Sequence, residues 1–345
     1  MKRRLGMVLL VSLMIASVLC GCNRIDVDNT QPSASGGPTG NSTESVQPTI
    51  DDEPKGKLIE LYLIGGQSNA VGSSEHKGQL PGVYKNVGYA GCCEMMRTGV
   101  PSGQYNLQNF YWEVKAGYGG TTTRVGPEYG MAQVLDPYYT GETKAFIFKS
   151  AAGATNLLNV EFGAGNWYPR SLWDEGYDPG KTSESMGFQY YWFVENFRLV
   201  YNKLVEEGYH PVVKGMAWNQ GSSDLPFYRA YEKLIKTFIT DLRNDLVQIT
   251  GDESLYQMPF VMGEICTSFD GYNNPYAPKF NAMLADVAAE MENVYVVDTS
   301  DFVLVDQNGN VVGTDRYHYN WADMEQLGAR FANKLVEVNN TTNQN

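Results

Sequence analysis

Short apolar runs alternate with longer amphipathic stretches from about residue 58 onwards, and no other feature of the sequence restricts the fold as much. Five runs have the length and composition of strands, at residues 58–64, 144–149, 212–218, 259–265 and 294–298. Amphipathic windows predict helices at residues 188–207, 227–248, 279–291 and 321–336, with Asn320 as the N-cap of the last. Such an alternation is typical of a parallel sheet with helices on both faces. The chain is therefore predicted to be an α/β protein, with its functional residues just after the carboxyl ends of strands.

The composition supports a globular protein with a large core, because 43% of the 345 residues are hydrophobic and only 19% are charged. The 26 Lys and Arg residues against 39 Asp and Glu residues give a formal net charge of −13. A strongly acidic chain is poorly suited to bind a phosphate backbone. We expect no nucleic-acid partner.

The first 22 residues have the pattern of a targeting segment. Basic residues at positions 2–4 precede an uncharged apolar stretch, residues 5–19, which is too short to span a bilayer comfortably. This stretch leads into Leu19-Cys20-Gly21-Cys22, which resembles a bacterial lipobox. Residues 1–22 are predicted to be a lipoprotein signal peptide with lipidation at Cys22, and an ordinary secretory signal is the alternative. The expected location is extracytoplasmic, with this lipid anchor alone holding the protein at a membrane.

The rest of the chain divides into three segments by composition. Residues 23–57 are rich in Ser, Thr, Gly, Pro and acidic residues and are predicted to be a flexible linker. Residues 58–338 are predicted to form one domain, and residues 339–345 a polar tail. Cys92, Cys93 and Cys266 give neither a disulfide framework nor a metal-binding motif, so we interpret them as small core residues. We expect neither a metal nor an organic cofactor.

The first predicted strand ends in Gly65-Gly66-Gln67-Ser68-Asn69. A serine flanked by glycine and small polar residues directly after a buried strand can point its hydroxyl into a crevice. Such a hydroxyl becomes a nucleophile when a base takes its proton. The other interpretation is an ordinary strand-to-loop turn, for which these residues are common. The stretch is not the GxSxG motif of the α/β-hydrolases, because Ala70 stands where the second glycine would be.

Three histidines are candidates for the base that would activate this serine. His76 lies in a polar loop, and His210 precedes a proline at the entrance of a strand, on the wrong end of the sheet. His318 lies directly before the last predicted helix, and Asp315 lies three residues earlier. A tight turn would bring the Asp315 carboxylate to the imidazole, where it would stabilise the imidazolium that forms on proton transfer. Ser68, His318 and Asp315 are therefore the candidate catalytic residues.

Acyl transfer also needs hydrogen-bond donors for the oxyanion of the transition state. Three candidates each follow a predicted strand: the backbone N–H of Ser68, the backbone N–H of Gly153 and the side-chain amide of Gln220. Small residues around Gly153 and Gln220 would let a carbonyl oxygen approach closely. Each of these motifs, taken singly, is equally compatible with a plain loop.

Five blocks occur in order: Gly66-Gln-Ser-Asn69, Gly126-Pro-Glu128, Lys149-Ser-Ala-Ala-Gly153, Trp218-Asn-Gln-Gly221 with Asp224, and Asp315-x-x-His318 followed by Leu327-Gly-Ala-Arg330. Together they resemble the SGNH hydrolase superfamily, in the branch of sialate O-acetylesterases and family-six carbohydrate esterases (acetylxylan esterases). The resemblance implies a flavodoxin-like, three-layer α/β/α sandwich with a mainly parallel five-stranded sheet. It also implies that Ser68 is the nucleophile, His318 the base and Asp315 its orienting acid. The oxyanion hole would consist of Ser68, Gly153 and Gln220.

The activity implied by this resemblance is a serine esterase that removes O-acetyl groups from carbohydrate through an acetyl-enzyme intermediate. Its substrate would be an acetylated oligo- or polysaccharide. Two alternatives stay open: a carbohydrate-binding lipoprotein whose catalytic site has decayed, and an SGNH esterase that acts on a non-carbohydrate ester. Ser222 supports the first alternative, because the family usually has Glu after Gln-Gly.

Other residues depart from the family pattern or have no assigned role. Ala154 replaces the second glycine of the usual Gly-Gly-Thr, and Ala70 replaces the usual Met. We expect Glu128 and Asp224 to brace loops through hydrogen bonds, although either could compete with Asp315 as the orienting acid. A surface for sugar rings is one interpretation of the aromatic residues in the loops, and packing in the interior is the commoner one. These residues are Tyr105, Phe110, Tyr111, Trp112, Tyr118, Trp167, Tyr168 and Trp173.

Overall fold

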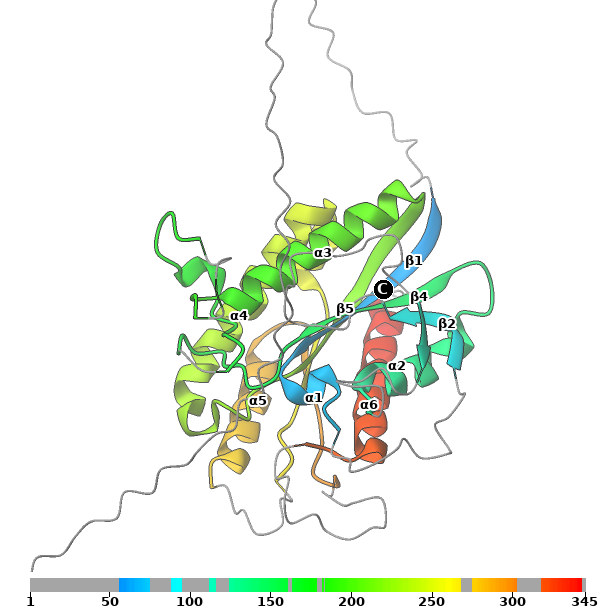
Figure 1. Cartoon of the computed structure of the whole chain (residues 1–345). Coiled ribbons are helices and arrows are strands. Elements are labelled where there is room, and N and C mark those ends of the chain that lie inside the picture. The colour runs from blue at the N-terminus through cyan, green and yellow to red at the C-terminus, as the bar shows by residue number, and fades with distance from the viewer. Residues whose placement is uncertain are drawn as a thin grey trace, which may run out of the picture. The chain divides into compact units, whose positions relative to one another are not determined.

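The computed structural model describes residues 56–74, 88–94, 112–115, 124–160, 163–178, 182, 184–267, 275–302 and 318–342 (Figure 1). The predicted signal peptide with Cys22 and the predicted linker up to residue 55 lie outside these residues. The candidate acid Asp315 and the rejected base His76 also lie outside them.

The described residues form a seven-stranded sheet in the order β3-β2-β4-β1-β5-β6-β7. The strands are β1 Lys57–Gly66, β2 Gly88–Glu94, β3 Trp112–Lys115, β4 Lys144–Ala151, β5 Tyr209–Asn219, β6 Phe260–Gly263 and β7 Val294–Val297. Neighbouring strands run parallel, except that β2 and β3 are antiparallel. The prediction of a mainly parallel sheet is confirmed, and the five predicted strands are β1, β4, β5, β6 and β7. β2 and β3 extend the sheet at one edge, and neither segment has the long apolar run from which the other strands were predicted.

The helices agree with the amphipathic windows to within a few residues, apart from the last. They are α1 Ser68–Val71, α2 Pro127–Leu135, α3 Phe188–Glu206, α4 Tyr228–Thr250, α5 Ala277–Glu290 and α6 Trp321–Thr342. Short 3₁₀ turns lie at Asp136–Tyr138, Arg170–Leu172, Leu225–Phe227 and Glu253–Gln257. Asn320 is the N-cap of α6, because its Oδ1 accepts a hydrogen bond from the backbone N–H of Asp323 (2.9 Å). α6 extends six residues beyond the predicted end, and α2 was not predicted.

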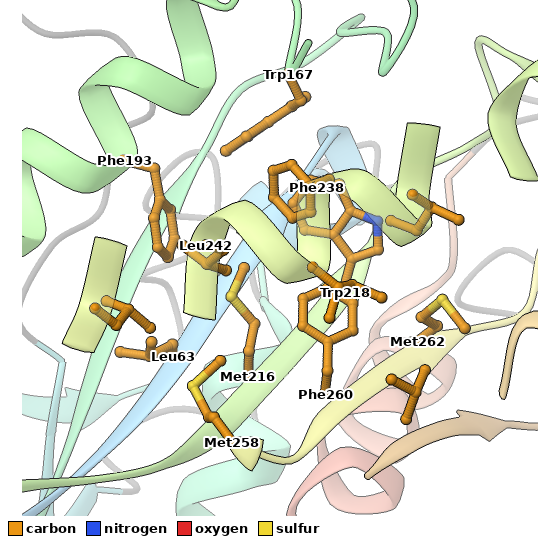
Figure 2. Close-up of a cluster of buried hydrophobic side chains, with 14 of the residues drawn as sticks. Leu63, Trp167, Phe193, Met216, Trp218, Phe238, Leu242, Met258, Phe260 and Met262 are labelled. Atoms are coloured by element: carbon orange, nitrogen blue, oxygen red, sulfur yellow. The ribbon is translucent and has the colours of Figure 1, made fainter. Parts of the chain in front are cut away.

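One face of the sheet is covered by α3, α4 and α5, which bury a hydrophobic core with many aromatic side chains against it (Figures 1 and 2). Four of the α4 residues that recur at three- and four-residue steps are buried, as their spacing predicts: Tyr231, Phe238, Leu242 and Leu246. Leu234, which the same spacing assigns to this face, is only half-buried. The ring of Trp218 in β5 lies 4.6 Å from that of Phe238, measured between centroids, and the two rings are tilted by 37°. These ring contacts fix the position of β5, whose carboxyl end leads into the loop with Gln220.

The other face is covered by α2 and α6, which pack against each other (Figure 1). Gly130 of α2 lies against the backbone of Glu325, and Gly328 of α6 lies against the backbone of Pro127, so a Cβ at either glycine would overlap a carbonyl oxygen. Helices on both faces make the fold a three-layer α/β/α sandwich, as predicted. Among the described residues, no helix is long and apolar enough to cross a membrane.

Candidate active site

Ser68 is the first residue of α1, and a single residue, Gln67, separates it from the carboxyl end of β1. Gly66 permits the turn, because its φ is +136° and an added Cβ would overlap the carbonyl group of Asn219 on β5. The backbone N–H of Gln67 donates to that same carbonyl oxygen (2.9 Å). The ends of β1 and β5 therefore fix the start of α1, and Ser68 is half-buried at the carboxyl ends of these strands.

Gly153 lies beside Ser68. The loop after β4 is tied to β1 by a hydrogen bond from the backbone N–H of Ala152 to the carbonyl oxygen of Gly66 (3.2 Å). A Cβ built on Gly153 would lie 3.9 Å from the Cβ of Ser68. The neighbouring Ala154 has a φ of +54°, a left-handed conformation that glycine adopts at lower cost. This conformation explains why glycine suits position 154 in the usual Gly-Gly-Thr pattern.

The segment with His318 is hydrogen-bonded to the serine turn, although 250 residues separate the two in sequence. The backbone N–H of Tyr319 donates to Oδ1 of the buried Asn69 (3.4 Å). Ser68 precedes Asn69 and His318 precedes Tyr319, so this bond brings the candidate nucleophile and base into one neighbourhood. His318 is half-buried and lies directly before α6. The proposed contact with Asp315 falls outside the described residues.

Gln220 follows β5 and is buried. Its side-chain amide takes part in a hydrogen-bond network with Gln67, Thr155 and Asp224. Its Nε2 donates to Oδ2 of Asp224 (2.7 Å) and to the carbonyl oxygen of Thr155 (3.0 Å), with Oε1 of Gln67 at 3.4 Å. Oε1 of Gln67 also accepts from the backbone N–H of Gly221 (2.9 Å). An amide N–H₂ has two hydrogens to donate, and acceptors of the protein face both. Gln220 would have to exchange one of these bonds to serve as a donor in an oxyanion hole.

Asp224 is fully buried and braces two loops, as expected. Besides the Gln220 amide, its carboxylate accepts from the backbone N–H of Leu157 (3.0 Å) and from Nδ2 of Asn156 (3.2 Å). Burial raises the pKa of this carboxyl, and these donors partly offset the effect. Asp224 therefore supplies a carboxylate to Gln220, although Ser222 stands where the family usually has Glu.

Glu128 braces a different part of the site. It lies in the first turn of α2 and forms an ion pair with Lys149 of β4, with 2.7 Å between Oε2 and Nζ. Gly126 leaves room for this carboxylate, because an added Cβ would overlap it. The position of Lys149 inside an otherwise apolar strand is a signal in the sequence that a buried partner is needed.

The structure also gives Gln67 and Asn69 a role that residue patterns did not. Both flank Ser68 in the first block, and both use their side-chain oxygens to hold other loops of the site.

Among the loop aromatics, Trp167 is fully buried in the core, 5.0 Å from Trp218, so it cannot face a sugar. Tyr168 and Trp173 are half-buried, and the side chains of the others lie outside the described residues.

Comparisons with known proteins identify a family for this chain and solved structures with a similar fold. The sequence model of the family described as "Carbohydrate esterase, sialic acid-specific acetylesterase" matches residues 58–337. No curated protein matches the sequence. A solved structure named NanS is 12% identical and has a TM-score of 0.57, with 82% of this chain and 98% of the other covered. A protein from Arabidopsis thaliana is 16% identical and has a TM-score of 0.51, with the same coverage of both chains.

A three-layer α/β/α sandwich with a serine turn at the carboxyl end of β1 is the fold of the SGNH hydrolases. The family match is more specific. The chain belongs to the carbohydrate esterase family of sialic acid-specific acetylesterases. It is a carboxylic ester hydrolase, and its substrate class is acetylated carbohydrate.

Proposed function

We propose that the protein removes O-acetyl groups from carbohydrate through an acetyl-enzyme formed on Ser68. The observation that carries this proposal is the hydrogen bond between Asn69 and Tyr319, because it joins the serine turn to the segment with His318. In this mechanism His318 takes the proton of Ser68 as the hydroxyl attacks the ester carbonyl. Asp315, three residues before His318, would orient the imidazole and stabilise its charged form.

The remaining steps follow from the same groups. As the tetrahedral intermediate collapses, the sugar oxygen leaves with the proton that His318 has taken, and the acetyl group stays on Ser68. A water molecule, deprotonated by His318, then attacks the acetyl carbonyl and releases acetate and free Ser68. The backbone N–H groups of Ser68 and Gly153 are two candidate oxyanion donors, and Gly153 lies beside Ser68. Gln220 is the third candidate donor, and it would have to give up its hydrogen bond to Thr155 or to Asp224 to take this role.

An O-acetylated sialic acid is the substrate that we propose first, because the matching family is the sialic acid-specific one. The net charge of −13 works against an anionic sugar and favours a neutral one such as acetylated xylan. A panel of acetylated sialic acid, xylan and pectin, with acetate release as the readout, separates the two. Faster release from xylan than from sialic acid would overturn the sialate assignment.

The variant Ser68→Ala tests the mechanism. We expect turnover of a small acetyl ester to fall by at least about 10³-fold with the fold intact, because only binding and the oxyanion donors would remain. Ser73→Ala is the matched control, since Ser73 is also half-buried and lies just after α1, and it should keep wild-type activity. A Ser68→Ala enzyme with a tenth of the wild-type rate would rule out this nucleophile. A wild-type protein inactive on every ester, yet able to bind the sugars, would indicate a decayed site.

We also propose that the protein is an extracytoplasmic lipoprotein, anchored through Cys22. The support is the pattern of the first 22 residues, in which basic residues and then an apolar stretch precede Leu19-Cys20-Gly21-Cys22. β1 begins at Lys57, at the end of the strand opposite to Ser68, so the chain enters the domain away from the candidate site.

A further inference from the structure

The ion pair between Glu128 and Lys149 is completely shielded from solvent, with side-chain exposures of 1% and 0%. Moving two charges out of water costs several kcal/mol for each ion, by order of magnitude, and their attraction often does no more than offset it. Apolar residues of similar volume would commonly serve stability equally well. Stability alone therefore does not explain the pair, and its position in the fold is more informative.

On one side, the pair holds the serine turn. Nζ of Lys149 lies 3.4 Å from the carbonyl oxygen of Val71, the last residue of α1, to which it donates. The α1 turn is tightly bonded, since the backbone N–H of Val71 donates to Gln67 and that of Ser73 donates to Ser68 (2.9 and 2.8 Å). A shift at the end of this turn would therefore be transmitted to Ser68. Lys149 also lies on β4, the strand that leads to Gly153.

On the other side, the pair holds the helix that follows the candidate base. Glu128 lies in α2, which contacts α6 backbone to backbone through Gly130 and Gly328. Such close packing leaves no room for one helix to slide over the other. α6 begins at Trp321, three residues after His318. The position of α2 therefore sets the position of the segment with His318.

We propose that Glu128 and Lys149 are positioning residues whose buried ion pair fixes Ser68 relative to His318. This inference rests on the proposed function, because it gives the pair a task in the same site. The pair touches neither substrate nor reacting atoms in this role. It acts through α1 on one side and through α2 and α6 on the other, in parallel with the direct bond between Asn69 and Tyr319.

The test removes both charges together, in the variant Glu128→Met/Lys149→Met, because one buried charge left alone would destabilise the protein. We expect this variant to melt within about 5 °C of the wild type. Its kcat for a small acetyl ester should fall about 10–100-fold with KM little changed, because a misplaced nucleophile slows the chemical step rather than binding. Wild-type kcat would overturn the proposal. Failure to fold would also overturn it, since the pair would then serve the fold as a whole.

The control variant is Arg170→Met/Asp245→Asn. It removes another ion pair, 2.5 Å between Nη2 and Oδ1, which joins the Arg170–Leu172 turn to α4 on the other face of the sheet. This control should keep wild-type kcat. An equal fall in kcat in both double variants would show a general effect of removing ion pairs and would overturn the proposal.

Amide hydrogen exchange provides a readout that does not depend on turnover. We expect faster exchange in residues 68–73 and 318–320 of Glu128→Met/Lys149→Met, and no change there in the control. Unchanged exchange in both segments would overturn the positioning role even if kcat fell. If the wild-type protein hydrolysed no ester at all, the proposed function would fail, and exchange would still decide whether the pair holds these two segments.

Discussion

Gln220 shows, at the scale of a single residue, how chemistry and structure compete for the same hydrogen-bond donors. The resemblance assigns its amide to the oxyanion hole, whereas the structure directs Nε2 to Asp224 and to the carbonyl oxygen of Thr155. An oxyanion that forms near Gly153 could attract one of these hydrogens, because a full negative charge is a stronger acceptor than a carbonyl oxygen. Both roles can therefore be measured on one variant.

Gln220→Ala should lower kcat about 10²–10³-fold with KM little changed, because an oxyanion donor acts mainly in the transition state. It should also lower the free energy of unfolding by about 1–3 kcal/mol, since Asp224 loses a donor in a buried place. Steady-state kinetics and melting curves measure the two effects separately. A folded Gln220→Ala enzyme with wild-type kcat would leave the hole to the backbone N–H groups of Ser68 and Gly153.

The stability effect of Gln220→Ala should depend on pH through Asp224. Burial raises the folded-state pKa of this carboxyl above its unfolded value, so ionisation opposes folding. The favourable contribution of the protonated form is complete below the unfolded pKa and is lost as the pH rises through the folded pKa. The Gln220 amide stabilises the ionised form more strongly than the protonated one, so the destabilisation should be larger at about pH 8 than at about pH 4. Chemical denaturation of both proteins at the two pH values tests this, and a constant difference would contradict it.

At the scale of the elements, α2 and α6 contact each other backbone to backbone. A glycine on each helix allows the two backbones to touch. The glycine of α6, Gly328, belongs to the Leu327-Gly-Ala-Arg330 block. Leu327 is fully buried in the core beneath. Glycine is thus required at position 328 for packing, against its low propensity for helices.

Gly328→Ala should lower the free energy of unfolding by about 1–3 kcal/mol, because its Cβ would overlap the carbonyl oxygen of Pro127 and force the helices apart. Without that overlap, alanine in a helix would gain about 0.5–1 kcal/mol. Gly141→Ala is the control, since an added Cβ there meets nothing within 4 Å. Urea denaturation of the wild type, Gly328→Ala and Gly141→Ala measures these free energies of unfolding. A Gly328→Ala protein more stable than wild type would show that α2 and α6 can move apart to accommodate the added Cβ without a net cost.

At the scale of the whole molecule, the parallel sheet gathers residues that are far apart in the chain. The carboxyl ends of β1, β4 and β5 supply Ser68, Gly153 and Gln220 to one edge. β1 starts at the opposite edge, to which the residues before Lys57 connect. The proposed lipid anchor at Cys22 would be joined to the domain through the residues that precede β1.

Cys22→Ser tests this anchor. We expect the variant to leave the membrane fraction or to fail to mature, because a polar segment such as residues 23–57 has no affinity for lipid. Fractionation followed by immunoblotting measures the change, with Cys266→Ser as the control, because Cys266 is buried in the domain core and cannot carry a lipid. Equal membrane association of Cys22→Ser and wild type would show that something other than lipidation at Cys22 holds the protein there.

The sequence by itself determined where five of the seven described strands and four of the six described α-helices lie along the chain, and with them the α/β class. Apolar runs and helical periodicity are local signals, so β1, β4, β5 and α4 were predicted from their own residues. The same reasoning placed Ser68 after a strand and His318 before a helix. Local patterns were insufficient for β2, β3 and α2, which have short or weakly apolar segments and are stabilised by their neighbours in the fold.

Only the tertiary structure decided which residues hold one another. The partner of a buried polar group is set by the three-dimensional packing and not by distance along the chain. Asn69 and Tyr319 are 250 residues apart, and Gln220 and Gln67 are 153 apart, yet both pairs meet at one edge of the sheet. Lys149 is a charged residue in an otherwise apolar strand, and its partner, Glu128, comes from α2. The sequence named the residues for the chemistry, and their hydrogen-bond and ion-pair partners depended on which strand and helix ends the sheet brings together.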